Sequence, residues 1–171
     1  MKLRSISLVI VFLAMIVSCK KDKNTTARDW TNNIEALYQY NTSKVTITQG
    51  IAGTLTMRSG NCMPIVDPNG DCKEYPIRRF IHIYSYAKDS NVVKDNHGFY
   101  TQVNTTFYKK VESDDEGFFQ AELNPGTYSV FIEEQGRFYA NSYDGFGGIN
   151  PVTIIFQTVS KVNQVIDYAV Y

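Results

Sequence analysis

Apolar and polar residues alternate most clearly within residues 114–132, and the alternation predicts two short β-strands. Every second residue is apolar over 119–123 and again over 128–132, which is the period of a strand with one buried face. An acidic turn ends at Gly117 before the first strand, and an Asn-Pro-Gly turn ends at Gly126 between the two. Each glycine can adopt the positive φ that such turns need. We therefore expect a β-hairpin around which the remaining strands assemble.

Similar patterns predict further strands on both sides of this pair. They cover residues 51–57, 77–86, 105–112, 152–157 and 162–171, separated by polar, turn-rich stretches at 58–76, 87–101 and 133–150. Strand 77–86 carries apolar residues on both faces, so we expect it to be central, with its second face covered by a loop or by the N-terminal lead-in. About seven closely spaced strands without a long amphipathic helix predict an all-β fold, a single β-sandwich over residues 50–171.

Residues 29–49 form the lead-in to this domain. Apolar side chains recur at helix-like spacing over 29–40, which is compatible with one or two helical turns or with an extended segment. We expect Trp30 to pack against the sandwich rather than to stack on a ligand, because a lone large ring at a domain edge usually buries area.

The N-terminus has the pattern of a targeting segment. Two basic residues precede an apolar run over 6–17 that is too short for a comfortable membrane span, and the small Ser18 precedes Cys19. Ile16-Val17-Ser18-Cys19 resembles the lipobox of bacterial lipoproteins. The resemblance implies a signal peptide over 1–18 and a diacylglycerol on the Cys19 thiol. The acyl chains would then anchor the mature protein to a membrane. The alternative is a plain secretory peptide with an incidental cysteine.

Residues 19–28 are polar and featureless, as expected of a flexible tether. Surface-displayed lipoproteins of Bacteroidota carry an acidic signal after the cysteine, whereas here Asp22 lies among three lysines. We therefore expect an outer-membrane anchor in the cell envelope and leave the periplasmic and surface faces open. Without residues 1–18 the chain keeps 15 basic and 17 acidic residues, a net charge of −2, so nucleic acid is not an expected partner.

Several motifs resemble the carboxypeptidase regulatory-like domain. They are Gly53-Thr54-Leu55-Thr56, the acidic turn ending in Gly117-Phe118, Leu123-Asn124-Pro125-Gly126-Thr127-Tyr128-Ser129-Val130 and a valine-rich last strand. The resemblance covers residues 50–171 and implies a transthyretin-like, or prealbumin-like, sandwich. Gly60-Asn61-Cys62-Met63-Pro64 and Phe138-Tyr139-Ala140-Asn141 are similar to a subset found as lipoproteins in Bacteroidota.

The resemblance does not imply catalysis. In metallocarboxypeptidases this module accompanies a separate zinc-bearing catalytic domain, which does not fit within these residues. The related hydroxyisourate hydrolases end in Tyr-Arg-Gly-Ser, whereas this chain ends in Asp-Tyr-Ala-Val-Tyr. Hydrolase activity is therefore not expected from the family likeness.

Cys62 and Cys72 are the two cysteines other than Cys19, and both lie in the predicted loop 58–76. Because export compartments are oxidising, we expect a Cys62–Cys72 disulfide rather than free thiols or a metal pair. Closing so short a loop should stabilise the fold by roughly 2.8 kcal/mol in the chain-entropy model.

No motif predicts a metal, a cofactor or a catalytic group. The stretch 67–71 looks like the start of a calcium loop, but its glycine comes one place early and the bidentate glutamate is absent. The acidic residues 114–116 are better explained as the turn that leads into the predicted hairpin than as a calcium site. His82 and His97 lie far apart in sequence, and zinc needs three or four convergent ligands. No Gly-x-Ser-x-Gly elbow is present.

The Gly-rich loop 133–150 is the best candidate for recognition. Flat apolar rings there alternate with short polar groups, a mixture typical of binding surfaces, and loops on a rigid sandwich commonly carry function. The candidate residues are Tyr139, Asn141, Tyr143, Asp144 and Phe146, with Asn150 nearby. The alternative is that these rings fold back and cap the end of the sandwich.

The sequence thus favours a non-catalytic, membrane-anchored lipoprotein whose sandwich binds a protein or glycan of the cell envelope. A structural subunit or spacer of an outer-membrane assembly is the alternative, and a small hydrolase is a distant third.

Overall fold

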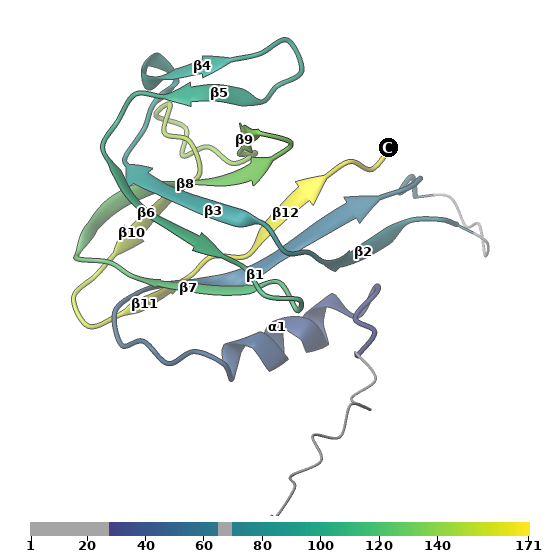
Figure 1. Ribbon diagram of the computed structural model, residues 1–171. Helices are drawn as coiled ribbons and strands as arrows, with labels where there is room; N and C mark the ends of the chain where they lie inside the picture. Colours follow the sequence, from purple (N-terminus) through teal and green to yellow (C-terminus); the bar gives the residue numbers. More distant parts are fainter. Residues whose placement is uncertain (1–27, 65–69) are drawn as a thin grey trace, which may run out of the picture.

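Two β-sheets pack face to face in the computed structural model, which describes residues 28–64 and 70–171 (Figure 1). One helix, α1 (Ile34–Thr42), lies against the outer face of the first sheet. The expected all-β sandwich is confirmed. The predicted signal peptide, Cys19, all but the last residue of the tether, and positions 67–69 lie outside the described residues.

The first sheet is built on the long strand β1 (Gly50–Ser59), which pairs with two short strands on each edge. On one edge β7 (Phe118–Glu122) and then β2 (Lys73–Pro76) run antiparallel to β1. On the other edge β11 (Val159–Lys161) and then β12 (Gln164–Asp167) run parallel to it.

The second sheet is antiparallel and follows the order β4-β5-β9-β8-β3-β6, with β10 paired to the first half of β8. Its strands are β3 (Phe80–Ser85), β4 (Val92–Lys94), β5 (Tyr100–Val103), β6 (Phe107–Glu112), β8 (Gly126–Glu134), β9 (Arg137–Tyr139) and β10 (Pro151–Ile154). A short 3₁₀ helix, η1 (Asp89–Asn91), precedes β4. The described residues contain twelve strands rather than about seven, because β1 and β8 are each bordered by successive short partners. β3 lies between β8 and β6, so the prediction of a central strand is confirmed.

The predicted hairpin over 114–132 is wrong, because β7 and β8 belong to different sheets. β7 pairs with β1, whereas β8 pairs with β3, β9 and β10. The Asn-Pro-Gly turn therefore carries the chain across the sandwich from one sheet to the other. Gly117 and Gly126 do adopt the expected positive φ, at 70° and 152°. Alternation tells which side chains are buried but not which strand lies alongside, since both arrangements bury the same residues.

Three short strands, β2, β4 and β9, lie in stretches predicted to be loops. Three or four residues are too few to display a period of two. The two-residue hairpin in this region is the one between β8 and β9, where Gln135 and Gly136 both have positive φ, at 52° and 75°. Such a turn matches the right-handed twist of the paired strands.

The main core lies between the two sheets. Strands β1, β3, β7, β8 and β12 contribute aliphatic or aromatic side chains that are almost fully buried, whereas β6 contributes only the partly buried Val111. The buried side chains include Ile51 and Leu55 of β1, Ile81 and Ile83 of β3, Phe119 of β7, Val130 and Ile132 of β8, and Ile166 of β12.

A second cluster lies on the outer face of β3 and β8, which confirms that a loop covers that face. Phe131 of β8 packs there against Tyr100 of β5 and Ile149 of the loop before β10. Half-buried rings of Tyr84 and Phe138 complete the cluster.

The N-terminal lead-in covers the outer face of the first sheet rather than that of the second. Leu37 of α1 is fully buried, and Trp30 is buried against the ring of Tyr40 at 5.3 Å between centroids. The expected helical turns are present, although the helix begins at Ile34 and extends past the predicted limit to Thr42. The expected burial of Trp30 is confirmed, and the ring that it contacts belongs to α1 of the lead-in.

The predicted disulfide between Cys62 and Cys72 is confirmed, with the two Cα atoms 4.9 Å apart. It joins the chain just after β1 to the chain just before β2, and therefore closes the loop between two paired strands.

Candidate functional site

The candidate recognition residues lie in β9 and in the loop between β9 and β10, but the structure separates them into two groups. One group is bonded to the edge of the first sheet. The other forms a projecting tip over residues 143–147, which we call the tip loop.

The first group ties the second sheet to β12. The Tyr139 hydroxyl accepts a hydrogen bond from the Asp167 backbone N–H at 3.1 Å, and the Asn141 amide donates to the Val165 carbonyl at 3.2 Å. The Asn150 amide is buried and donates to the Gln164 side chain at 2.8 Å. Burial raises the pKa of the Tyr139 phenol, with the bond to Asp167 acting in the opposite direction. Tyr139 and Asn141 thus hold the edge strand β12 to the second sheet, and we call them the clamp residues.

Asp144 organises the tip loop. Its Oδ1 accepts hydrogen bonds from the Phe146 and Gly148 backbone N–H groups at 2.8 and 2.9 Å. Its Oδ2 accepts from the Tyr86 hydroxyl at 2.5 Å. The hydrogen bond from Tyr86 and the backbone N–H donors lower the pKa of the Asp144 carboxyl, because they favour its charged form.

Tyr143 joins the tip loop to a polar cluster on β4 and β5. Its hydroxyl lies 2.6 Å from the hydroxyl of the buried Tyr100, and the Lys94 ammonium donates to it at 3.4 Å. Lys94 also pairs with Asp89 at 3.0 Å. Burial, together with the bond to Tyr143, raises the pKa of Tyr100 strongly. Half of the Tyr143 side chain nevertheless remains exposed.

Phe146 projects from the tip loop with 83% of its surface exposed, the largest value among the large hydrophobic side chains of residues 28–64 and 70–171. It stands between Gly145 and Gly147, whose φ angles of 79° and 86° suit glycine and few other residues. Since Asp144 bonds the backbone on both sides of the ring, Phe146 is held in an exposed position by a defined loop.

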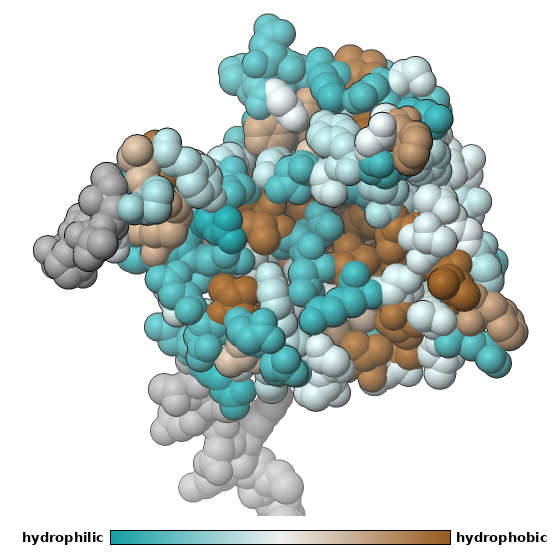
Figure 2. Space-filling view, turned by 180° about the vertical axis from the view of Figure 1, so that it is seen from behind, coloured by the Kyte–Doolittle hydropathy of each residue, from teal (hydrophilic) through white to brown (hydrophobic). Residues whose placement is uncertain are grey.

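Other exposed hydrophobic groups were not predicted from the sequence. Ile155 and Phe156 occupy the turn between β10 and β11, within residues predicted to be strand. Figure 2 shows hydrophobic side chains gathering toward this edge of the molecule. Phe107 and Tyr108 are exposed on β6, the last strand of the second sheet. The sequence around Ile155 contains no glycine or proline that would have indicated a turn.

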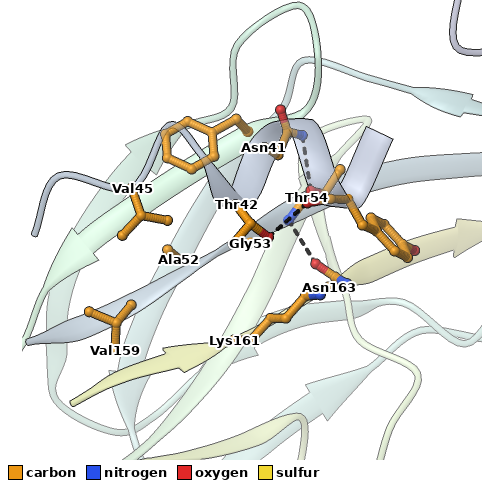
Figure 3. A pocket seen from close by; sticks show the side chains of 11 residues that line it. Asn41, Thr42, Val45, Ala52, Gly53, Thr54, Val159, Lys161 and Asn163 are labelled. Atoms are coloured by element: carbon orange, nitrogen blue, oxygen red, sulfur yellow. Dashed lines mark hydrogen bonds between the residues drawn. The ribbon is translucent and has the colours of Figure 1, made fainter. Parts of the chain in front are cut away.

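A cavity of about 220 Å³ lies between α1 and the outer face of the first sheet (Figure 3). It is lined mainly by apolar groups from α1, β1, β7 and β11. No sequence pattern indicated it, because its lining comes from four separate segments.

The carboxylates of the acidic turn 114–116, considered above for metal binding, take part in ordinary ion pairs. Lys44 bonds to Asp114 and lies 3.5 Å from Glu116, while Arg78 pairs with Asp115 at 3.1 Å. In the described part of the chain no three His, Cys, Asp or Glu side chains converge as metal ligands would.

His82 forms a charged cluster with Glu133 and Lys110. Its Nε2 and the Lys110 ammonium both lie 2.8 Å from the same Glu133 carboxylate oxygen, and these bonds lower the pKa of Glu133. His97 is exposed in the turn between β4 and β5, whereas His82 lies on β3.

Comparison with protein-family models, with curated proteins and with solved structures found no match. Within residues 28–64 and 70–171 no helix is long and apolar enough to cross a membrane.

Proposed function

We propose that this chain is a lipid-anchored binding protein of the bacterial cell envelope, and that its tip loop captures a protein or glycan partner without catalysing a reaction. The observation that carries the proposal is the exposed ring of Phe146 on a loop fixed by Asp144. Aromatic residues, phenylalanine among them, are enriched at protein interfaces relative to the rest of the surface. A loop that is already ordered loses little further conformational entropy on binding.

Tyr143 adds to the same surface. It lies three residues before Phe146 in the tip loop with half of its surface exposed, and the same loop carries the Asp144 carboxylate. Rings that combine an apolar face with hydrogen-bonding groups suit both protein hot spots and sugar faces.

The anchor is the second part of the proposal. Acylation of Cys19 would tether the domain to the outer membrane through residues 20–28. The two-sheet architecture supports the further proposal of a transthyretin-like domain of the carboxypeptidase regulatory-like family. Replacing Cys19 by serine should move the protein from the membrane fraction to the soluble fraction or leave the precursor uncleaved; unchanged membrane processing would contradict acylation.

A photo-cross-linking amino acid at position 146 tests the binding surface in intact cells. Position 156 is the matched control, since Phe156 is also a strongly exposed phenylalanine in a turn. We expect a discrete cross-linked species from position 146 and none from position 156. For a glycan partner, Phe146→Ala should lose binding to a glycan array on which Phe156→Ala retains it. Equal behaviour of the two positions in both assays would overturn the assignment.

A structural role within an envelope assembly is the second candidate, favoured by the edge strand β6. β6 pairs with β3 alone in the described chain, so its outer backbone edge can accept another strand. Cross-links from position 108 of β6 to one partner at constant stoichiometry would favour assembly over ligand capture.

A further inference from the structure

The cavity beneath α1 shares no lining residue with the tip loop, and its surface is mainly apolar, although the buried polar side chains of Asn41 and Thr54 also line it. Val45, Ala52, Phe118 and Val159 contribute its apolar lining, and Lys161 and Asn163 contribute polar groups (Figure 3). A mainly apolar hollow with a few placed polar groups is the usual form of a small-molecule site.

The cavity is held open by the fold. The outer face of β1 presents only the small side chains of Ala52, Thr54 and Thr56 beneath the helix. Asn41 of α1 fixes the helix above them, because its buried amide donates to Thr54 Oγ1 at 2.9 Å and to the Glu116 carbonyl at 2.8 Å. The helix cannot settle into the hollow without breaking these two buried hydrogen bonds.

Two hydrogen-bond donors lie at one side of the cavity. Lys161 is the last residue of β11, and Asn163 lies in the short connection between β11 and β12; Figure 3 shows the two side chains at the same side of the cavity. The Asn163 Oδ1 accepts from the Thr54 N–H at 3.1 Å, and its NH₂ group donates no hydrogen bond to the described residues. Lys161 lies 5.5 Å from the Tyr38 ring centre and has no carboxylate within 4.0 Å among the described residues.

We propose that this cavity binds a short-chain monocarboxylate, with its aliphatic tail inside and its carboxylate on Lys161 and Asn163. A volume of about 220 Å³ accommodates roughly seven water-sized groups at about 30 Å³ each, so the tail should hold six or seven carbons. The unpaired ammonium supplies the charge complement of a carboxylate, and the neighbouring amide supplies a second donor. The site is independent of the tip loop, and either proposal can fail alone.

Calorimetric titration of the full chain in lipid nanodiscs tests the site, with empty nanodiscs as the blank. The probes are butanoate, hexanoate, octanoate, decanoate and 1-hexanol. Affinity should rise roughly fourfold per added methylene and level off once the tail exceeds about seven carbons. Hexanol should bind roughly tenfold more weakly than hexanoate, because it lacks the charge-assisted bond. Equal affinities for hexanol and hexanoate would contradict recognition of the carboxylate by Lys161 and Asn163.

Matched variants locate the binding. Val159→Phe should fill the cavity and abolish hexanoate binding, whereas Val93→Phe, on the exposed strand β4, should not. Lys161→Gln should weaken hexanoate roughly tenfold. Lys88→Gln is its control, since Lys88 lies over Tyr86 at 5.8 Å as Lys161 lies over Tyr38.

Hydrogen–deuterium exchange of the unaltered chain provides a readout that does not depend on a variant folding. Hexanoate should slow exchange at residues 50–54 and leave 143–148 unchanged. Binding that is insensitive to Lys161→Gln, or protection confined to other segments, would overturn the proposal.

Discussion

The outer faces of the two sheets are covered in different ways. On the second sheet, the Phe131 ring meets the rings of Tyr84, Tyr100 and Phe138 at 5.5 to 6.1 Å between centroids, and the loop before β10 closes over them. On the first sheet, α1 crosses a row of alanine and threonine side chains and leaves a cavity of about 220 Å³. The size of the side chains beneath a cover thus decides whether it packs closely or leaves a binding-sized hollow.

The two covers also differ in how they are attached. Large rings attach the cover of the second sheet through dispersion and area burial, whereas paired amide and hydroxyl groups hold α1 at a fixed height. Mutations beneath each cover should therefore change the free energy of unfolding by different amounts and, where volume is added, in different directions.

The largest effect is expected from Phe131→Ala. Phe131 is fully buried among three rings, and truncating such a side chain typically costs about 3–5 kcal/mol of unfolding free energy. Thr54→Ala beneath α1 should cost less, about 1–3 kcal/mol, because it mainly removes the partner of the Asn41 amide. Denaturant unfolding of both variants measures the difference; equal losses would contradict the contrast between the covers.

Enlarging a side chain should have opposite effects on stability beneath the two covers. Ala87→Val enters the filled cluster of the second sheet and should destabilise by about 1–3 kcal/mol through overpacking. Ala52→Val enters the cavity and should be neutral or stabilise by about 0.5 kcal/mol. Thermal unfolding midpoints check the prediction. A destabilising Ala52→Val would show that the cavity does not accept the added methyl groups.

Mutating a clamp residue of β9 and mutating a residue of the tip loop should change stability by different amounts. Tyr139→Phe removes the acceptor of the Asp167 N–H and should cost about 1 kcal/mol. Phe146→Ala should change stability by no more than about 0.5 kcal/mol, since the ring is exposed. Urea unfolding of the two variants provides the measurement. A larger loss for Phe146→Ala would place that ring in the packed cover rather than on a binding surface.

The smallest effect is a pH dependence of the tip loop. The bond from Tyr86 and the backbone N–H groups lower the pKa of Asp144 in the folded chain below its ordinary value of 3.8. A lowered folded pKa stabilises the loop fully above the unfolded pKa, and the stabilisation disappears as the pH falls through the folded value. The amide NMR signals of Phe146 and Gly148 should therefore shift together below about pH 4. Asp144→Asn should abolish this titration; its persistence would assign it to another group.

Alternation in the sequence identified most of the buried side chains, because burial on one face of a strand imposes a period of two whatever the neighbouring strand is. It correctly identified residues 77–86 as containing a central strand, and the presence of two cysteines in one predicted loop led to the correct prediction of their bond. The same signal could not distinguish a hairpin from a crossing between sheets at Pro125, since both bury identical residues.

The tertiary structure alone separated Tyr139 and Asn141 from Tyr143 and Phe146. All four are polar or aromatic residues of one segment, but the first two meet the backbone of β12, which comes from a distant part of the chain. The cavity likewise depends on where α1 comes to rest above Ala52 and Thr54. A one-dimensional pattern records the environment of each side chain, whereas a clamp, a cavity or an exposed tip depends on which distant segments meet in three dimensions.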